Sequence, residues 1–192
     1  KEEKNFDGEV ITAFSCLEKV SKLCKHYGLE QTTTKIGFKY VCELMLNGGF
    51  LLGGEESGGM AIQGHIPERD GVWIGLTIWE YMAKSGKTLE ELIDEVYEIV
   101  GPFAFERIDL HLSEGQKQSV MEDCASGAIK ELVGRTIQRV DDTDGYKFFF
   151  NDDEWIMIRP SGTEPVLRTY CESTSSEAAI NLLKETHKQL LN

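Results

Sequence analysis

The sequence predicts a mixed fold in two parts: an α/β domain of layered strands and helices over residues 8–101, and an α+β domain with an antiparallel sheet and packed helices over residues 102–192. Three observations carry this prediction. Hydrophobic residues make up 41% of the 192 residues, and the mean hydropathy of -0.29 is typical of soluble globular proteins. Short apolar strand patterns alternate with helical periodicity up to Gly101–Pro102. Beyond that point, strand patterns follow one another with polar turns between them.

The first predicted elements are a strand over residues 9–12 and a helix that ends near Gly28. The spacing of Ser15 and Glu18 predicts a capping box at the start of that helix, because a serine three residues before a glutamate can satisfy two free backbone N–H groups. Its buried side is predicted to include Tyr27.

A second helix is expected over residues 36–46 and an apolar strand over 50–52. Asp70 is expected to cap a helix over 71–83, which is apolar on nearly every side and is therefore predicted to be largely buried. The remaining predicted elements are a helix opened by Thr88 and Glu91, a strand at 103–112, a helix from Ser113 and Gln116 to about Leu132, strands at 136–140, 146–150, 155–159 and 166–171, and a helix opened by Thr174 and Glu177.

Charge and composition exclude several function classes. With 33 acidic and 20 basic residues, the net charge of -13 repels phosphate backbones and anionic lipid, so we expect no nucleic-acid or membrane partner. The five cysteines show no metal-ligand spacing and are expected to be reduced and buried. No signal peptide or membrane span is expected, and we predict a cytoplasmic protein. Because the first residue is lysine, we expect a piece of a longer chain.

The run Arg159-Pro-Ser-Gly-Thr-Glu-Pro165 begins where an apolar strand stops. The guanidinium of Arg159 can donate two parallel hydrogen bonds to a phosphate. The hydroxyls of Ser161 and Thr163 can donate more, and Gly162 lets backbone N–H groups approach an anion closely. These residue types indicate a phosphate-binding loop, although an ordinary hairpin turn uses the same residues.

The run Gly53-Gly-Glu-Glu-Ser-Gly-Gly59 also follows an apolar strand. Carboxylates accept hydrogen bonds from sugar hydroxyls, and Ser57 can donate or accept one. The glycines allow such a loop to close around a ring. A sugar-binding loop and a solvated acidic turn are both compatible with this pattern.

Four segments together resemble the α-D-phosphohexomutase family. Arg159 to Pro165 resembles the phosphate-binding loop of the family's fourth domain, and Gly54-Glu-Glu-Ser-Gly58 resembles the sugar-binding loop of its third domain. The resemblance continues through Ile36-Gly-Phe-Lys-Tyr40 and His65-Ile-Pro-Glu-Arg-Asp-Gly71. It covers nearly the whole chain from about Glu9, so the chain looks like the C-terminal portion of a phosphoglucomutase/phosphomannomutase.

The resemblance implies a four-domain parent that interconverts hexose 1-phosphate and 6-phosphate through a bisphosphate intermediate. Its cofactors are Mg²⁺ and glucose 1,6-bisphosphate, and we expect this chain to bind no metal and to be inactive alone. The family's reactive Thr-Ala-Ser-His-Asn loop and its Asp-Gly-Asp-Gly-Asp metal loop are not in this sequence. We therefore expect the partners to be a hexose phosphate and the N-terminal domains of the parent.

The resemblance also implies roles for individual residues. Glu55 and Ser57 are expected to hold sugar hydroxyls, and Lys39 and Arg69 match positions near the sugar phosphate. The phosphate that is not transferred is expected to bind Arg159, Ser161, Gly162, Thr163 and Arg168.

Each of Lys39, Arg69 and Arg168 could instead be a solvated surface charge. Some family members have histidine where this chain has Gly59, so a proton-transfer role for that histidine does not carry over. We assign no catalytic residue to the chain.

Two other functions fit the same sequence. The chain could be a stand-alone sugar-phosphate-binding or regulatory module, or a structural interaction domain without an anion site. The exact substrate is also open: the Glu55-Glu-Ser57 sequence only weakly favours glucose over mannose, and glucosamine phosphate and pentose phosphates are alternatives. The Asp141-Asp-Thr-Asp-Gly145 run lacks the spaced ligands of a calcium loop and is predicted to be a hairpin turn.

Overall fold

The computed structural model describes residues 6–161 and 164–191. Contacts within the chain divide it into two compact units, residues 1–101 and 102–192. The mixed α/β fold class predicted from the sequence is confirmed. The two units are described separately below.

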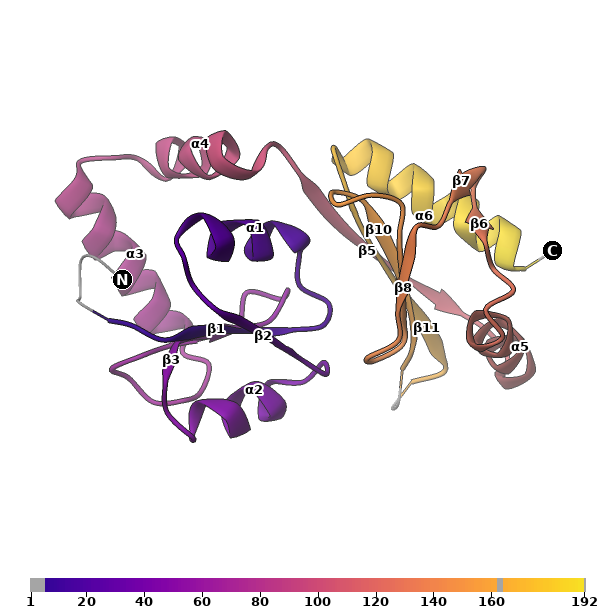
Figure 1. Ribbon diagram of the computed structural model, residues 1–192, viewed down its shortest axis with the longest axis horizontal. Coiled ribbons are helices and arrows are strands. Elements are labelled where there is room, and N and C mark those ends of the chain that lie inside the picture. Colours follow the sequence, from indigo (N-terminus) through magenta and orange to yellow (C-terminus); the bar gives the residue numbers. More distant parts are fainter. Residues whose placement is uncertain (1–5, 162–163, 192) are drawn as a thin grey trace. The chain divides into compact units, whose positions relative to one another are not determined.

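The first unit is built on a four-stranded sheet with the order β2-β1-β3-β4 (Figure 1). Strands β1 (Glu9–Ala13), β2 (Gln31–Thr34) and β3 (Phe50–Gly54) are parallel, whereas β4 (Met60–Ile62) is antiparallel to β3. Because β1 and β3 are parallel neighbours, the loops that follow them leave the same edge of the sheet.

Helices α1 (Glu18–His26) and α2 (Phe38–Met45) lie on opposite sides of this sheet (Figure 1). The core between α2 and the sheet consists of buried apolar side chains, namely Ile11, Phe38, Val41, Met45 and Ala61. The N-terminus of α2 is thereby held against the sheet, at Gly37.

The predicted start of α1 is wrong. The helix begins at Glu18 after Leu17, which makes no capping hydrogen bond, and the hydroxyl of Ser15 donates to Glu56 instead. Tyr27 is 52% exposed rather than buried, because it lies beyond the last turn of the helix. Two short strands, β2 and β4, were not predicted, since β2 is entirely polar and β4 is only three residues long.

Helices α3 (Gly71–Ser85) and α4 (Leu89–Val100) complete the first unit. Both predicted N-caps are confirmed: Asp70 accepts a hydrogen bond from the backbone N–H of Trp73, and Thr88 forms a full capping box with Glu91. These caps fix where the helices start.

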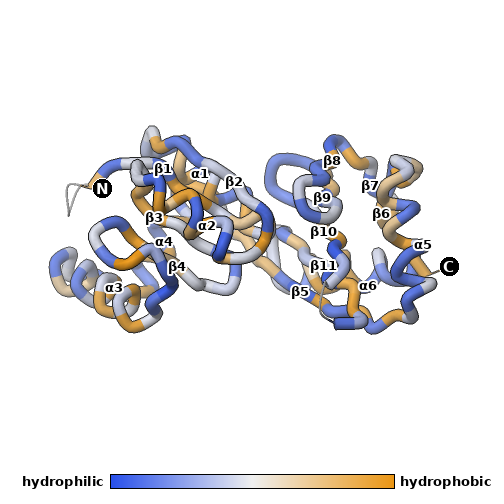
Figure 2. The backbone as a smooth tube through the Cα atoms, turned by 90° about the horizontal axis from the view of Figure 1, so that it is seen from below, coloured by the Kyte–Doolittle hydropathy of each residue, from blue (hydrophilic) through white to orange (hydrophobic). Residues whose placement is uncertain are grey.

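The prediction that α3 is largely buried is wrong. Among its described residues only Ile74 is buried, and α3 rests on β4 along one side. Figure 2 shows strongly apolar positions recurring along the helix, and most of them are exposed: Val72, Trp73, Leu76, Ile78, Trp79 and Tyr81. An all-round apolar sequence predicts burial, but it does not tell which element covers the helix.

The second unit contains a five-stranded antiparallel sheet with the order β5-β11-β10-β9-β8. Its strands are β5 (Ala104–His111), β8 (Arg139–Asp141), β9 (Tyr146–Phe149), β10 (Trp155–Pro160) and β11 (Val166–Ser173). Every pair is antiparallel, as the sequence predicts.

Helices α5 (Glu114–Ala125) and α6 (Ser176–Leu190) lie on one side of this sheet (Figure 1). The Ser113 cap of α5 is confirmed, but α5 ends at Ala125 and not near Leu132. The short hairpin of β6 (Glu131–Leu132) and β7 (Arg135–Thr136) replaces its predicted last turns. Ser175, one residue after the predicted Thr174, caps α6.

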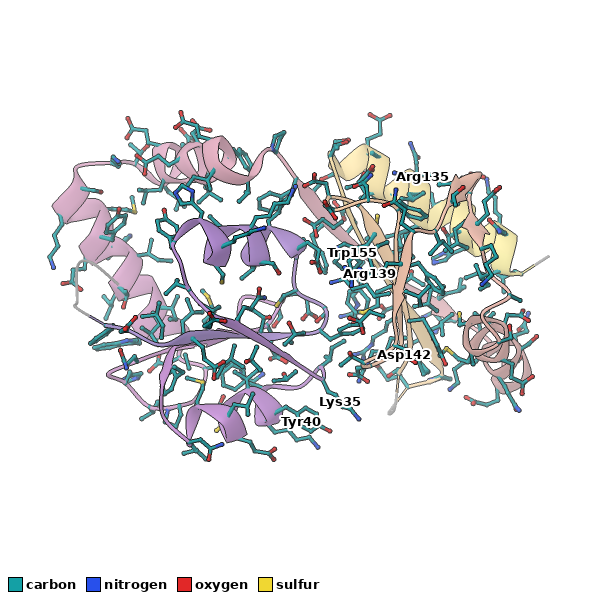
Figure 3. The ribbon with its side chains drawn as sticks, in the orientation of Figure 1. Lys35, Tyr40, Arg135, Arg139, Asp142 and Trp155 are labelled. Atoms are coloured by element: carbon teal, nitrogen blue, oxygen red, sulfur yellow. The ribbon has the colours of Figure 1, made fainter. Side chains whose placement is uncertain are left out.

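The two faces of the second sheet differ in chemistry. Ile156, Ile158 and Leu167 belong to the apolar core beneath the helices. The opposite face carries aromatic rings with cations over them. Lys147 Nζ lies 3.9 Å from the centre of the Trp155 ring, and the Arg139 guanidinium lies 3.5 Å from that of Phe149. Figure 3 labels Arg139 on β8 and Trp155 on β10.

All five cysteines are free thiols, but the prediction that they are buried is confirmed only for Cys24, Cys124 and Cys171, because Cys16 and Cys42 are partly exposed. Burial raises the pKa of the Cys124 and Cys171 thiols to about 12, so they stay protonated and unreactive near neutral pH. No helix among the described residues is long and apolar enough to cross a membrane.

Candidate functional site

The predicted sugar loop follows β3 and folds back on itself. The backbone N–H of Glu55 donates to the Gly59 carbonyl at 3.0 Å, and the N–H of Gly58 donates to the Glu55 carbonyl at 3.0 Å. Gly58 has a φ of 84°, a conformation that glycine adopts without strain. The turn leaves Ser57 exposed at its tip.

Glu55 lies in a partly desolvated position. Its side chain is only 9% exposed, and a terminal nitrogen of Arg69 lies 3.5 Å from its carboxylate. The backbone N–H of Gly37, at the start of α2, lies close enough to this carboxylate to lower its pKa. Burial raises the pKa of Glu55, and the positive charge of Arg69 offsets part of that rise. Three of the segments found in the sequence therefore converge on one carboxylate.

Arg69 lies along the sugar loop. Its Nε donates to Glu68 at 3.1 Å, and its guanidinium lies 5.0 Å from the centre of the Phe38 ring. A Cβ atom added to Gly59 would come within 2.6 Å of Arg69 Cδ. The arginine stem therefore fills the space that a side chain at position 59 would need.

Ser57 and Lys39 are both exposed, unlike Glu55. The Ser57 hydroxyl would lie 3.7 Å from a Cβ at Gly59, which places it in the same small region as Arg69. Lys39 is exposed in the first turn of α2, with its ammonium 4.6 Å from the centre of the Tyr40 ring. No ion pair among the described residues joins Lys39 to Glu55.

The sequence pointed to His65 as a residue that shapes this loop, but it gave the partners of neither His65 nor Ser15. His65 Nε2 lies 2.9 Å from the Asp70 carboxylate, and its ring stacks on Trp73 with centroids 4.4 Å apart. Asp70 thus holds both the start of α3 and His65, and those hydrogen bonds lower its pKa. The partner of Ser15 is Glu56. The spacing of Ser15 and Glu18 predicted a helix cap, so the hydrogen bond from Ser15 to Glu56 was not expected.

In the second unit, the strand register places Arg159 of β10 directly opposite Arg168 of β11. Directly opposite residues on neighbouring antiparallel strands point to the same face of a sheet, so the two guanidinium groups share one face. Their side chains are only 20% and 23% exposed. Like charges directly opposite each other are unfavourable, and anionic groups must offset the repulsion.

Carboxylates flank both arginines. Arg159 Nε lies 3.2 Å from Asp144, in the turn between β8 and β9. Arg168 pairs with Glu164 at 2.6 Å and lies 4.0 Å from Asp109. The Arg107 guanidinium holds Asp109 through two hydrogen bonds and lowers its pKa. The pair of arginines is therefore ordered by acidic groups around it.

Ser161 follows the arginine strand and is buried. Its backbone N–H donates to the Val166 carbonyl at 3.0 Å, and its hydroxyl accepts from the backbone N–H of Glu164 at 3.3 Å. The predicted ligands Gly162 and Thr163 lie outside the described residues. The described part of the loop is thus a closed turn beside two arginines.

The donor set does not fit a metal ion. Within residues 6–161 and 164–191, no group of three His, Cys, Asp or Glu side chains is close enough together to hold one. The carboxylates near Arg159 and Arg168 are already engaged by guanidinium groups. No chemical step through magnesium is therefore assigned to this chain.

Two family models match the chain. Residues 1–100 match "Phosphoglucomutase/phosphomannomutase, alpha/beta/alpha domain III", and residues 112–189 match the C-terminal domain of the same family. Together they cover most of both units.

Individual relatives agree with this assignment. A phosphoglucomutase/phosphomannomutase from Thermococcus kodakarensis is 32% identical over 96% of this chain, which spans only 40% of that relative's length. A crystal structure from Thermus thermophilus, assigned as a phosphomannomutase, superposes with a TM-score of 0.81 and 31% identity over 100% of this chain and 38% of its own.

A more distant structure shares the fold alone. The N-acetylphosphoglucosamine mutase of Aspergillus fumigatus, solved with glucose 1,6-bisphosphate, is 12% identical with a TM-score of 0.61, over 98% of this chain and 39% of its own. A second structure of that protein contains GlcNAc-6P and magnesium. From the two family matches and the relatives above 30% identity, the chain belongs to the phosphoglucomutase/phosphomannomutase family and corresponds to its domain III and C-terminal domain.

Proposed function

We propose that this chain is the substrate-binding part of a longer enzyme that interconverts hexose 1-phosphate and 6-phosphate. It binds the sugar and one phosphate of a hexose bisphosphate. The observation that carries the proposal is the register of β10 and β11, which sets Arg159 opposite Arg168 beside the buried Ser161. In a chain with a net charge of -13, such a pair is a local exception that favours a dianion.

In this proposal the second unit anchors the phosphate that is not transferred. A guanidinium presents two parallel donors to a phosphate, and two guanidinium groups on one face can bind it from neighbouring sides. Arg159 and Arg168 supply these donors, and the loop supplies Ser161, Gly162 and Thr163. In the free chain Arg159 lies beside Asp144 and Arg168 pairs with Glu164. On binding, the phosphate replaces these carboxylates as the partner of the two arginines.

In this proposal the first unit binds the sugar ring. Glu55 accepts hydrogen bonds from sugar hydroxyls, and Ser57 at the loop tip donates or accepts one. Arg69, next to Glu55, and Lys39, in the first turn of α2, supply positive charge for the sugar phosphate. Because one loop binds the ring and the other anchors the phosphate at its far end, both orientations of a bisphosphate can be held by the same fixed groups.

The transferred phosphoryl group requires other parts of the parent. We assign the phosphoserine and the magnesium site to other segments of the parent, because the family's reactive serine loop and its metal loop do not occur in this sequence. Magnesium supplies charge neutralisation at the phosphoryl group. Glucose 1,6-bisphosphate is the intermediate that both loops are proposed to hold, and it is present in the structure of the Aspergillus fumigatus fold relative.

Binding can be tested on the 192-residue chain by following backbone amide NMR signals during a titration with glucose 1,6-bisphosphate. We expect shifts near Ser161 and Arg168 and near Ser57 and Gly58. Arg168→Met should weaken binding by about 10-fold to 100-fold, as loss of a charge-assisted hydrogen bond predicts.

A matched control removes a cation from the same sheet away from the pair. Arg139→Met fits, because Arg139 lies over Phe149 near the other end of the strands (Figure 3). It should bind the bisphosphate like the wild type. Equal binding by wild type and Arg168→Met, or no shifts in either loop at millimolar ligand, would contradict the proposal. Magnesium-dependent mutase turnover by the pure chain would contradict the assignment of catalysis to other segments.

A further inference from the structure

The two adjacent carboxylates of the sugar loop have different partners. Glu55 faces Arg69 and the N–H of Gly37. Glu56 instead accepts a hydrogen bond from the hydroxyl of Ser15. Glu55 and Glu56 are chemically identical neighbours in the sequence, but they bind different parts of the first unit.

Ser15 lies in a tight turn after β1. The N–H of Cys16 donates to the carbonyl of Ala13 at 2.9 Å and closes this turn. The Ser15 residue has 0% exposure. A hydroxyl so far from water has a strong requirement for its partner, and here the partner is charged. The hydrogen bond to Glu56 is therefore a specific link between two loops.

The sheet topology explains why these loops meet. Thr12 of β1 pairs with Gly54 of β3 in parallel register, so both strands end at the same edge. The thiol of Cys16 donates to the carbonyl of Gly54 at 3.7 Å, which adds a weaker contact at the base of the loop. The turn after β1 is thus placed against the sugar loop by the sheet itself.

The hydrogen bond from Ser15 reaches Glu56, a residue that the hydrogen bonds within the sugar loop do not hold. The bonds from Glu55 N–H to Gly59 and from Gly58 N–H to Glu55 close the loop on itself. Ser15 ties Glu56, between these points, to the rigid end of β1.

We propose that Ser15 is a positioning residue for sugar recognition: it holds Glu56 inward, and so presents Glu55 and Ser57 on either side of it to the sugar hydroxyls. Glu56 is then a structural anchor and not a hydroxyl ligand. This inference rests on the proposed function, because it concerns the same sugar loop.

The test compares Ser15→Ala with the wild type in the 192-residue chain. We expect the affinity for glucose 1,6-bisphosphate to fall by about tenfold. Affinity for inorganic phosphate at the second unit, followed at the Ser161 and Arg168 amides, should not change. Ser15→Thr keeps the hydroxyl and should restore bisphosphate binding. Because a first unit that failed to fold would also separate the two ligands, the amide signals of that unit in Ser15→Ala must remain as dispersed as in the wild type.

A second readout needs no ligand. In ¹⁵N relaxation of the free chain, Ser15→Ala should increase the motion of the Gly58 and Gly59 amides. Glu56→Ala removes the same bond from the loop side and should match it, which covers the case that Ser15→Ala does not fold. If the wild type binds no bisphosphate, the proposed function fails while relaxation still decides the role of Ser15. Unchanged loop motion together with unchanged affinity would overturn the inference.

Discussion

Glu154 accepts hydrogen bonds from three side chains at once. Arg135 donates two, at 3.2 and 2.6 Å, Asn151 donates one at 3.1 Å, and Ser173 donates one at 2.7 Å. The Arg135 guanidinium is the largest cause that lowers the pKa of Glu154, from 4.5 to about 2. At the residue scale, this cluster joins the β6–β7 hairpin to β11 and makes the stability of the second unit depend on pH.

The sign of that dependence follows from the lowered pKa. The unfolded chain binds a proton at Glu154 below pH 4.5 and the folded chain only below about 2, so the stabilisation is present above 4.5 and is lost as the pH falls through 2. Arg135→Met should lower the free energy of unfolding by roughly 2 kcal/mol at pH 7 and by less at each step down to pH 3. Urea unfolding across this range measures the difference.

The exposed pair of Lys188 and Glu185 provides the control. Lys188→Met should cost at most about 1 kcal/mol. A deficit for Arg135→Met that is as large at pH 3 as at pH 7 would show that lost packing, and not the charge, causes it.

At this scale, the sequence indicates candidate site residues by their chemical type but does not give their partners. Arg159 and Ser161 were predicted from the strand end and its hydroxyls, and Arg69 from its motif. Ser15 was assigned to a helix cap because that role needs only local spacing. Its contact with Glu56 spans two strands, and no local pattern encodes it.

Among the elements, the hairpin between β8 and β9 has a second role. The run Asp141 to Gly145 is the predicted turn, in which the backbone N–H of Thr143 donates to Asp141 at 3.0 Å. The turn also packs closely against β10, the strand that carries Arg159. A Cβ on Gly145 would lie 2.7 Å from the Ile158 carbonyl and 3.0 Å from Arg159 Cβ. The hairpin therefore sets where Arg159 stands.

Gly145→Ala tests this role. Gly145 has a φ of 101°, and the methyl group would also displace Arg159, so we expect both lower stability and weaker phosphate binding. Gly127→Ala is the matched control, since Gly127 has a φ of 66° with nothing within 4 Å of the added Cβ. It should lose stability by about 1 kcal/mol and keep phosphate affinity. Phosphate titration of both variants separates strain from displacement, and equal affinities would refute the role.

Element prediction succeeded where a local interaction decides the outcome. The caps at Asp70, Thr88 and Ser113 are examples, because each satisfies backbone groups a few residues away. Strand β2 was missed because threonine favours strands through its branched Cβ and not through an apolar pattern. The end of α5 was missed because a hairpin paired by tertiary contacts replaces it.

At the scale of the whole molecule, α3 exposes large apolar side chains. Val72 is 75% exposed and Trp79 is 71% exposed, on a helix whose other side rests on β4. Contiguous apolar surface of this kind favours association. The sequence predicted an apolar helix correctly, but its burial depends on contacts that the helix itself does not encode.

We expect the 192-residue chain to self-associate as its concentration rises. Replacing Val72 and Trp79 together by lysine should shift sedimentation velocity profiles toward the monomer. Leu46→Lys is the control, because Leu46 is equally exposed at 70% but lies at the end of α2 rather than on α3. If the doubly substituted chain associates like the wild type, the α3 surface is not responsible.

The pairing of Arg159 with Arg168 also limits how their strands can vary. Side chains alternate between the two faces of a sheet, so a slip of β10 against β11 by one residue would turn one guanidinium into the apolar layer of Ile158 and Leu167. Insertions and deletions within β10 or β11 are therefore expected to be excluded, because each would shift the register of the arginine pair.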